Sequence, residues 1–191
     1  MAHVITPIKR LLIANRGEIA RRIIRTAHDM GISTVAIYAD GDAQAPFVTE
    51  ADSAVALNGR TTAETYLDID KVLAACKRSG ADAIHPGYGF LSENAAFAQA
   101  VIDADIKWLG PTPEVIGLMG DKLSAKRLMD EAGVPTLPGI EISADTDIVA
   151  AANEIGYPVL VKASAGGGGR GMRVVEQEAD LLAAVAGAKR E

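Results

Sequence analysis

The sequence is short of cysteine and of clustered positive charge, and each shortage excludes a class of protein. Its single cysteine is Cys76. One thiol can form neither an intramolecular disulfide nor a zinc site, so we expect a small core residue in a protein of the reducing cytoplasm. The formal net charge of −6 argues against a nucleic-acid or anionic-membrane partner, because such surfaces need clustered lysine and arginine. A small anionic ligand is still compatible, since a few local donors outweigh the global charge.

Long apolar segments are missing as well. The first ten residues have no apolar region of the kind that a secretory signal carries. No apolar run approaches the roughly 18 residues that a membrane-spanning helix needs. The hydrophobic fraction of 49% and the charged fraction of 23% are typical of a soluble globular chain. A length of 191 residues suffices for one domain and part of a second.

Short apolar runs alternate with amphipathic segments through the first part of the chain. The pattern predicts strands over residues 10–14, 34–38, 53–57, 83–85 and 107–109, and helices over residues 17–30, 69–79 and 93–102, the last two capped by Asp68 and Ser92. Repeated β-α-β units imply a mostly parallel sheet with helices on both faces. The fold class is therefore α/β, with a first domain over residues 1–113.

The pattern changes after Thr112-Pro113-Glu114, which has the features of a helix start. Two helices separated by Gly120 are expected to form a helical linker over residues 114–136. The rest, residues 137–191, is expected to hold a helix over 147–155, a strand over 158–162, a glycine-rich loop, a strand over 172–176 and a final helix.

The glycine-rich loop is the most informative segment. Five of the residues between 162 and 173 are glycine, and glycines in such numbers cost backbone entropy without adding packing. They let backbone N–H groups approach phosphate oxygens closely. Lys162 ends the incoming strand and places an ammonium point charge beside the same phosphates. A flexible linker is the alternative, but linkers are not usually bracketed by a lysine-ending strand and by Arg170 and Arg173.

Three nucleotide-binding patterns compete for this loop. A P-loop requires Lys and Ser or Thr after its last glycine, whereas Met172 and Arg173 follow Gly171. The pattern G-x-G-x-x-G is formally met, but the loop leads into a strand and not a helix. The first β-α turn, where a dinucleotide motif belongs, has only Gly17. The remaining arrangement is a strand–glycine loop–strand lid with a lysine on the incoming strand, which is that of the ATP-grasp enzymes.

Three further segments make a resemblance to one family specific. Residues 12–20 read LIANRGEIA, residues 83–94 read AIHPGYGFLSEN, and residues 119–122 read MGDK. With the glycine loop, they resemble biotin carboxylases over essentially the whole chain, in the same order and approximate spacing. The resemblance implies a Rossmann-like pre-ATP-grasp domain with a parallel sheet, followed by a truncated ATP-grasp lid subdomain. It also implies an ATP-dependent ligase that uses MgATP and bicarbonate to carboxylate biotin in an acyl-CoA carboxylase of fatty acid metabolism; the front of pyruvate carboxylase is similar.

The resemblance assigns roles to individual residues, although it assigns no catalytic residue. The residues that it places at ATP are Lys122, Lys162, Gly166, Gly167, Gly168, Gly169, Arg170, Gly171 and, beside the adenine, Met172. Those that it suggests as lining the site are Arg16, His85, Gly87 and Glu93. The structural alternatives are that His85 only hydrogen-bonds the turn, that Glu93 serves a helix dipole, and that the two lysines are surface residues.

Arg22 is the candidate residue of a homodimer interface, because this helix contributes to the dimer in the family. The alternatives are a solvated helix face and an i,i+4 pair with Glu18. No magnesium ligand is assigned in this chain, because the family's ligands are expected further along.

Several parts of the family's machinery have no counterpart in the sequence. These are the carboxylates that hold magnesium, the groups that bind bicarbonate, the biotinyl carrier domain and the carboxyltransferase subunit. We therefore expect the chain to be the N-terminal portion of a biotin carboxylase, incomplete for catalysis by itself. The alternatives are a short non-catalytic module for nucleotide binding or subunit association, and another ATP-grasp or dinucleotide-binding protein.

Overall fold

The computed structural model describes residues 6–120, 122–143, 145–162 and 172–190, with the side chains of residues 122 and 123 excepted. The chain divides into two compact units, residues 1–120 and residues 121–191. Each unit has its own hydrophobic core. No helix of the described residues is long and apolar enough to cross a membrane.

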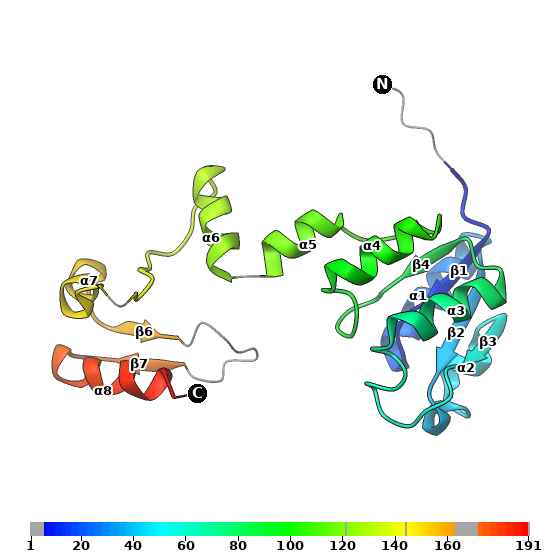
Figure 1. Ribbon diagram of the computed structural model, residues 1–191, viewed down its shortest axis with the longest axis horizontal. Coiled ribbons are helices and arrows are strands. Elements are labelled where there is room, and N and C mark those ends of the chain that lie inside the picture. The colour runs from blue at the N-terminus through cyan, green and yellow to red at the C-terminus, as the bar shows by residue number, and fades with distance from the viewer. Residues whose placement is uncertain (1–5, 121, 144, 163–171, 191) are drawn as a thin grey trace. The chain divides into compact units, whose positions relative to one another are not determined.

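The first unit is built on a five-stranded sheet (Figure 1). Its strands are β1 (Arg10–Ile13), β2 (Ser33–Tyr38), β3 (Ser53–Ala56), β4 (Ala83–His85) and β5 (Lys107–Trp108). They lie in the order β3-β2-β1-β4-β5, and every neighbouring pair is parallel. The predicted α/β fold with a parallel sheet is thus confirmed.

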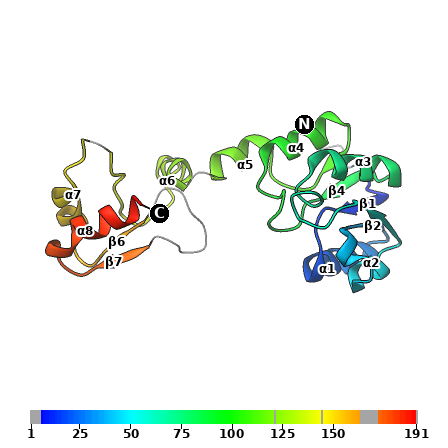
Figure 2. The same cartoon turned by 60° about the horizontal axis from the view of Figure 1, so that its bottom comes forward.

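Helices cover both faces of this sheet, as the alternation predicts (Figure 2). They are α1 (Gly17–Asp29), α2 (Pro46–Glu50), α3 (Ile69–Ser79) and α4 (Ala95–Asp103). The 3₁₀ turn η1 (Asp40–Asp42) follows β2, and α5 (Pro113–Gly120) packs against α4. On one face, Ile13 packs with Ile24 of α1 and Phe47 of α2. On the other, Leu12 packs with Cys76 of α3 and Phe97 of α4. Successive residues of a strand point to opposite faces, so a continuous apolar run supplies both cores.

One predicted helix start is wrong. The side chain of Asn94, not that of Ser92, caps α4 by accepting a hydrogen bond from the Phe97 N–H at 2.9 Å. Ser92 instead donates its backbone N–H to the Gly89 carbonyl at 3.0 Å. A turn therefore occupies the residues that the pattern assigned to the first part of the helix. The cap at Asp68 is confirmed, with its side chain accepting from the Lys71 N–H at 3.0 Å.

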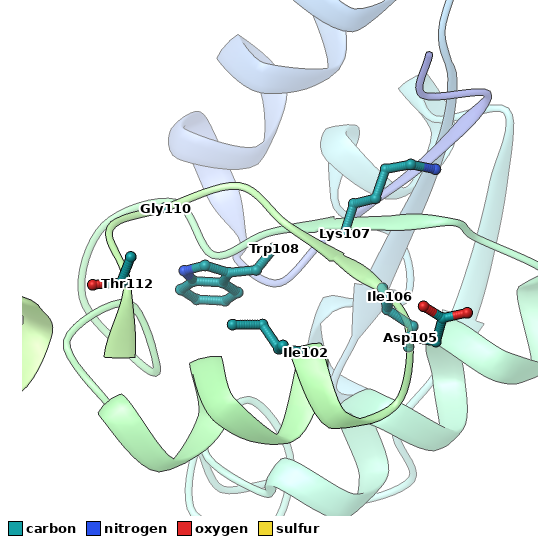
Figure 3. Close-up of a pocket in the computed structure, with 7 residues that line it drawn as sticks. All are labelled: Ile102, Asp105, Ile106, Lys107, Trp108, Gly110 and Thr112. Atoms are coloured by element: carbon teal, nitrogen blue, oxygen red, sulfur yellow. The ribbon is translucent and has the colours of Figure 1, made fainter. Parts of the chain in front are cut away.

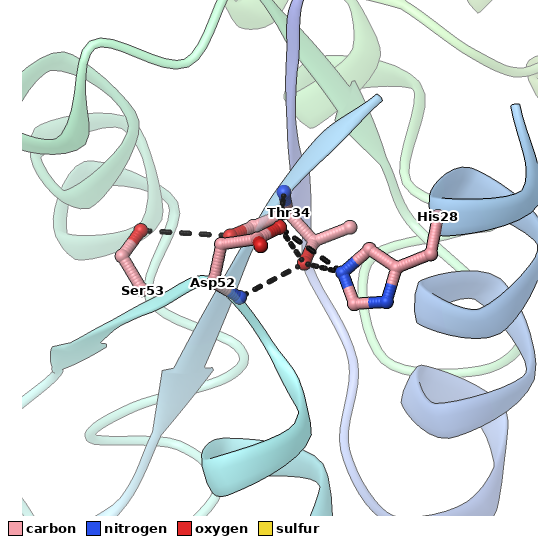
Figure 4. A network of polar contacts seen from close by, with 4 residues as sticks. All are labelled: His28, Thr34, Asp52 and Ser53. Carbon is pink, nitrogen blue, oxygen red and sulfur yellow. Dashed lines mark hydrogen bonds and ion pairs between the residues drawn. The ribbon is translucent and has the colours of Figure 1, made fainter. Parts of the chain in front are cut away.

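A polar network joins the amino-terminal ends of β2 and β3 (Figure 4). Asp52 accepts hydrogen bonds from the Thr34 N–H at 2.7 Å and from the Thr34 hydroxyl at 2.9 Å. His28, at the end of α1, places its Nε2 atom 3.0 Å from the same carboxylate. The bond from the Thr34 N–H is the largest of the influences that lower the pKa of Asp52. This network ties α1 to the sheet edge opposite the carboxyl ends of the strands.

The second unit is a helix-covered hairpin. Its elements are α6 (Lys122–Glu131), α7 (Ile148–Ile155), β6 (Val159–Val161), β7 (Arg173–Val175) and α8 (Glu178–Ala188), and β6 and β7 are antiparallel. The inward side chains of Val159, Val161 and Val175 form a core with Leu181 and Val185 of α8. The predicted strand–loop–strand arrangement is confirmed in its two strands, whereas the loop residues 163–171 lie outside the described residues.

Candidate functional site

The carboxyl ends of β1 and β4 meet at the point where the strand order of the first unit reverses. β2 lies on one side of β1 and β4 on the other. The connection after β1 therefore leads toward one edge of the sheet, and the connection after β4 leads toward the other edge. Open α/β sheets bind ligands in the crevice at such a point. The predicted residue Arg16 follows β1, and the segment that begins at His85 follows β4. The topology therefore brings these two sequence motifs to one edge of the sheet.

Asn15 joins the two motifs. Its side chain is 1% exposed, and its Nδ2 atom donates hydrogen bonds to the carbonyls of Pro86 at 2.9 Å and of Tyr88 at 2.8 Å. Its Oδ1 atom accepts the Arg16 N–H at 2.9 Å. A buried amide with its donors and acceptor all satisfied holds its partners in fixed positions. No feature of the sequence marks Asn15 as a site residue, although it lies inside the first motif.

Gly87 sits where only glycine fits. Its φ of +67° lies in the left-handed region, and a Cβ atom there would lie 2.6 Å from the Asn15 Nδ2 atom. Gly89 has the same φ, but a Cβ atom there would have no heavy atom within 4 Å. The turn 86–91 therefore packs tightly against Asn15 at Gly87, whereas at Gly89 there is room for a side chain.

His85 makes a hydrogen bond within this turn. Its Nδ1 atom accepts the Gly87 N–H at 3.0 Å, which leaves the proton of the neutral ring on Nε2. Burial lowers the pKa of His85, which favours the neutral ring near pH 7. His85 therefore forms the hydrogen bond to the turn that the sequence offered as the structural alternative to a place in the site.

Arg16 belongs to a second cluster at the same edge. Its guanidinium pairs with the carboxylate of Asp42 and lies 5.8 Å from the centre of the Tyr66 ring. The bond to Asp42 is the main cause that raises the pKa of Arg16, and burial is the main cause that raises the pKa of Tyr66. Tyr66 stacks on Phe90 with ring centres 5.1 Å apart. Asp42 and Tyr66 were not predicted, because Asp42 ends the short 3₁₀ turn η1, Tyr66 lies in a turn before α3, and neither segment carries a motif.

Two predicted residues stand apart from these contacts. Glu93 is exposed just before the α4 cap, and within the described residues no hydrogen bond or ion pair joins it to Arg16 or His85.

Arg22 is exposed on α1. In the described part of the chain no ion pair links it to Glu18, and the neighbouring Arg21 pairs instead with Glu50 at 2.6 Å. The exposed position of Arg22 is compatible with the predicted interface.

The predicted ATP residues belong to the second unit. Lys162 follows β6 and Met172 precedes β7, and both are exposed. Because Val161 pairs with Arg173, Lys162 and Met172 come next, at the end of the hairpin where the loop joins the two strands. Lys122 begins α6, but its side chain lies outside the described residues, as do Gly166, Gly167, Gly168, Gly169, Arg170 and Gly171.

A surface hollow of about 370 Å³ lies along α4 and β5 (Figure 3). Ile102 and the Trp108 indole line it, and the Trp108 Nε1 atom donates to the Pro111 carbonyl at 2.8 Å. The Lys107 amine, which points away from the indole, pairs with Asp82 at 2.7 Å. None of the predicted site residues lines this hollow.

These two units define an α/β protein whose strand order reverses between β1 and β4 and which has, next in sequence, a lysine-bearing hairpin. Residues 7–116 match the model of the biotin carboxylase N-terminal domain, and residues 121–191 match that of the carbamoyl-phosphate synthase L chain ATP-binding domain. The chain belongs to the biotin carboxylase family, as its motifs predict.

Relatives and solved structures agree with this assignment. The chain is 51% identical over 175 residues to the biotin-dependent acyl-coenzyme A carboxylase alpha3 subunit of Mycobacterium leprae, covering 91% of this chain and 29% of that protein. It is 49% identical over 181 residues to the biotin carboxylase of Halalkalibacterium halodurans, covering 94% and 40%. The biotin carboxylase–beta-gamma-ATP complex from Campylobacter jejuni superimposes with a TM-score of 0.86 at 46% identity, covering 97% of this chain and 42% of that one.

A second solved structure is that of the biotin carboxylase domain of the 2-oxoglutarate carboxylase of Hydrogenobacter thermophilus, in complex with MgADP, ADP and bicarbonate. It gives a TM-score of 0.82 at 44% identity and covers 96% of this chain and 41% of that one. The chain thus spans about 40% of the length of the biotin carboxylases that it matches, and less of the multidomain subunits.

Proposed function

We propose that this chain is the front part of a biotin carboxylase, in which its second unit covers the phosphates and adenine of MgATP and its first unit supplies residues that line the active site of the whole enzyme. The whole enzyme uses MgATP and bicarbonate to carboxylate biotin. The chain by itself holds only part of that machinery. The family assignment and the 40% share of its relatives' length support this reading.

The observation that carries the proposal is the outer face of the β6–β7 hairpin. Strand residues alternate between faces, so Leu160 and Val174 point away from the core beneath α7 and α8; their side chains are 46% and 64% exposed. Met172, 48% exposed, and Lys162 continue this alternation on the same face. An apolar face that ends in a lysine and a glycine loop fits a purine ring followed by a triphosphate.

The proposed chemistry of this face is electrostatic. The ammonium of Lys162 stabilises negative charge on the phosphate oxygens, and the N–H groups of the glycine loop donate to them. Lys122 is proposed as a second cation, and Met172 with Leu160 as the adenine contact. The described residues contain no group of three or more histidine, cysteine or acidic side chains that could hold a metal ion.

The partners of the whole protein follow from the same proposal. They are bicarbonate, biotin on a carrier domain, and a carboxyltransferase subunit, with a homodimer formed through the face of α1 that carries Arg22. Relatives with the names of acyl-CoA and propionyl-CoA carboxylase alpha subunits support a multidomain assembly. Which acyl group is finally carboxylated is determined by the carboxyltransferase and not by this chain.

The size of the native polypeptide tests whether the chain acts as part of a longer enzyme. An antibody raised against the chain should detect, on a denaturing gel of the source cells, a band of more than twice its 19.9 kDa, because 94% of this chain covers only 40% of the biotin carboxylase that it matches. A band at the mass of the chain itself would contradict the proposal and favour a non-catalytic nucleotide-binding or subunit-association module.

A further inference from the structure

Side chains from four different loops meet at the carboxyl edge of the first unit. Arg16 follows β1, Asp42 follows β2, Tyr66 follows β3 and Phe90 follows β4. None of these residues is a sequence neighbour of another. The contacts therefore link the conformation of each loop to that of the next.

Asp42 is the centre of this cluster. Its side chain is mostly buried, one carboxylate oxygen pairs with Arg16, and the other accepts the Tyr66 hydroxyl at 2.6 Å. Burying a carboxylate costs solvation free energy, and an apolar replacement often stabilises a fold as well or better. The Asp42 carboxylate is therefore expected to fix the positions of its two partners rather than to add much stability to the fold.

Tyr66 transmits this arrangement to the turn after β4. Its hydroxyl donates to Asp42 and accepts the Ala39 N–H at 3.1 Å, so the polar end of the side chain is fixed. Its ring is 2% exposed and lies nearly parallel to the Phe90 ring, with an interplanar angle of 15°. The position of Asp42 thus determines where Phe90 can pack.

The turn 86–91 needs such anchors. Gly87, Gly89 and Phe90 all have positive φ, at +67°, +67° and +47°, and a left-handed phenylalanine is unfavourable unless its surroundings hold it. Asn15 holds the first half of the turn, and the Tyr66 ring holds the second half through Phe90. Between the two anchors, Tyr88 is 66% exposed.

We propose that Asp42 and Tyr66 are positioning residues, which act through Phe90 to fix the turn 86–91 and so hold Tyr88 at the carboxyl edge of the sheet. The importance of this turn for the reaction rests on the proposed function. The coupling itself is a property of the first unit alone.

Residue-resolved amide hydrogen exchange of this chain tests the coupling. The Gly87, Ser92 and Asn94 amides report on the turn, because they donate to His85 Nδ1, the Gly89 carbonyl and the Leu91 carbonyl. The Ala14 and Leu109 amides report on the sheet, because they donate to the carbonyls of His85 and Ile84.

Asp42→Asn and Tyr66→Phe should each accelerate exchange of the turn amides about tenfold, the effect of losing one charge-assisted hydrogen bond, while the sheet amides keep their rates. Glu50→Gln, which disrupts the exposed ion pair with Arg21 in the same unit, should change neither group.

Two results would overturn the proposal. Unchanged exchange of the turn amides in both variants would mean that Asp42 and Tyr66 do not hold the turn. Acceleration of turn and sheet amides by the same factor would mean that they only stabilise the unit. The measurement involves no nucleotide, so its outcome is independent of whether the hairpin of the second unit binds MgATP.

Discussion

In the full-length enzyme, replacing Lys162 with alanine is expected to weaken MgATP binding by a factor of about 5 to 150, corresponding to about 1–3 kcal/mol. The proposal places this ammonium beside the phosphates, and its removal leaves phosphate charge without a partner. The side chain is exposed and lies next to β6, outside the core formed by α7, α8 and the hairpin. The substitution should therefore leave the free energy of unfolding within about 0.5 kcal/mol of the wild-type value.

Isothermal titration calorimetry with MgATP measures this effect, and two further variants sharpen it. Lys162→Arg keeps the positive charge and should retain part of the affinity, since a guanidinium differs from an ammonium in shape and hydration. Lys189→Ala removes an exposed lysine after α8 and should leave binding unchanged. A dissociation constant that does not change in Lys162→Ala would exclude its phosphate role.

Replacing Gly87 with alanine is expected to lower the free energy of unfolding of the first unit by about 3 kcal/mol. An alanine in the left-handed region costs about 1 kcal/mol. Its Cβ atom would also lie 2.6 Å from the Asn15 amide nitrogen, and displacing a buried amide from its carbonyl partners costs about 1–3 kcal/mol more. Chemical denaturation followed by the fluorescence of Trp108, the single tryptophan, reports on this unit.

Gly89→Ala provides the matched control for this experiment. Gly89 has the same φ of +67°, but its Cβ atom would have no heavy atom within 4 Å. It should lose only the backbone contribution of about 1 kcal/mol. Equal losses in the two variants would show that the fit between Gly87 and Asn15 does not hold the turn in place.

The sequence was sufficient to predict the elements whose pattern is regular. The strands that precede Asn15 and Pro86 are short, continuous apolar runs, and the helix after Asp68 has a carboxylate cap. Short elements escaped prediction: η1 and α2 are too brief to show a helical period. Both Ser92 and Asn94 are suitable residues to cap the start of α4. Ser92 is part of a turn, in which its N–H donates to the Gly89 carbonyl, so the helix begins later and Asn94 caps it.

The residues of the candidate site that lie in contiguous motifs could be predicted from the sequence. The residues that only the fold brings to the site could not. Arg16 and the turn after His85 were found because they lie in recognisable runs, and their proximity follows from the order of the strands. Asp42 and Tyr66 contact Arg16 across 26 and 50 residues of sequence, and no local pattern marks either one. The outer face of the hairpin required the register of β6 and β7, which pairs Leu160 with Val174.

Titration of the wild-type chain with MgATP, and separately with NADH, tests the central claim most directly. The hairpin with Lys162 and the glycine loop should bind MgATP, whereas the first β-α turn, with a single glycine, lacks the fingerprint that a dinucleotide needs. The account predicts saturable binding of MgATP and none of NADH. Tight binding of NADH without binding of MgATP would contradict it.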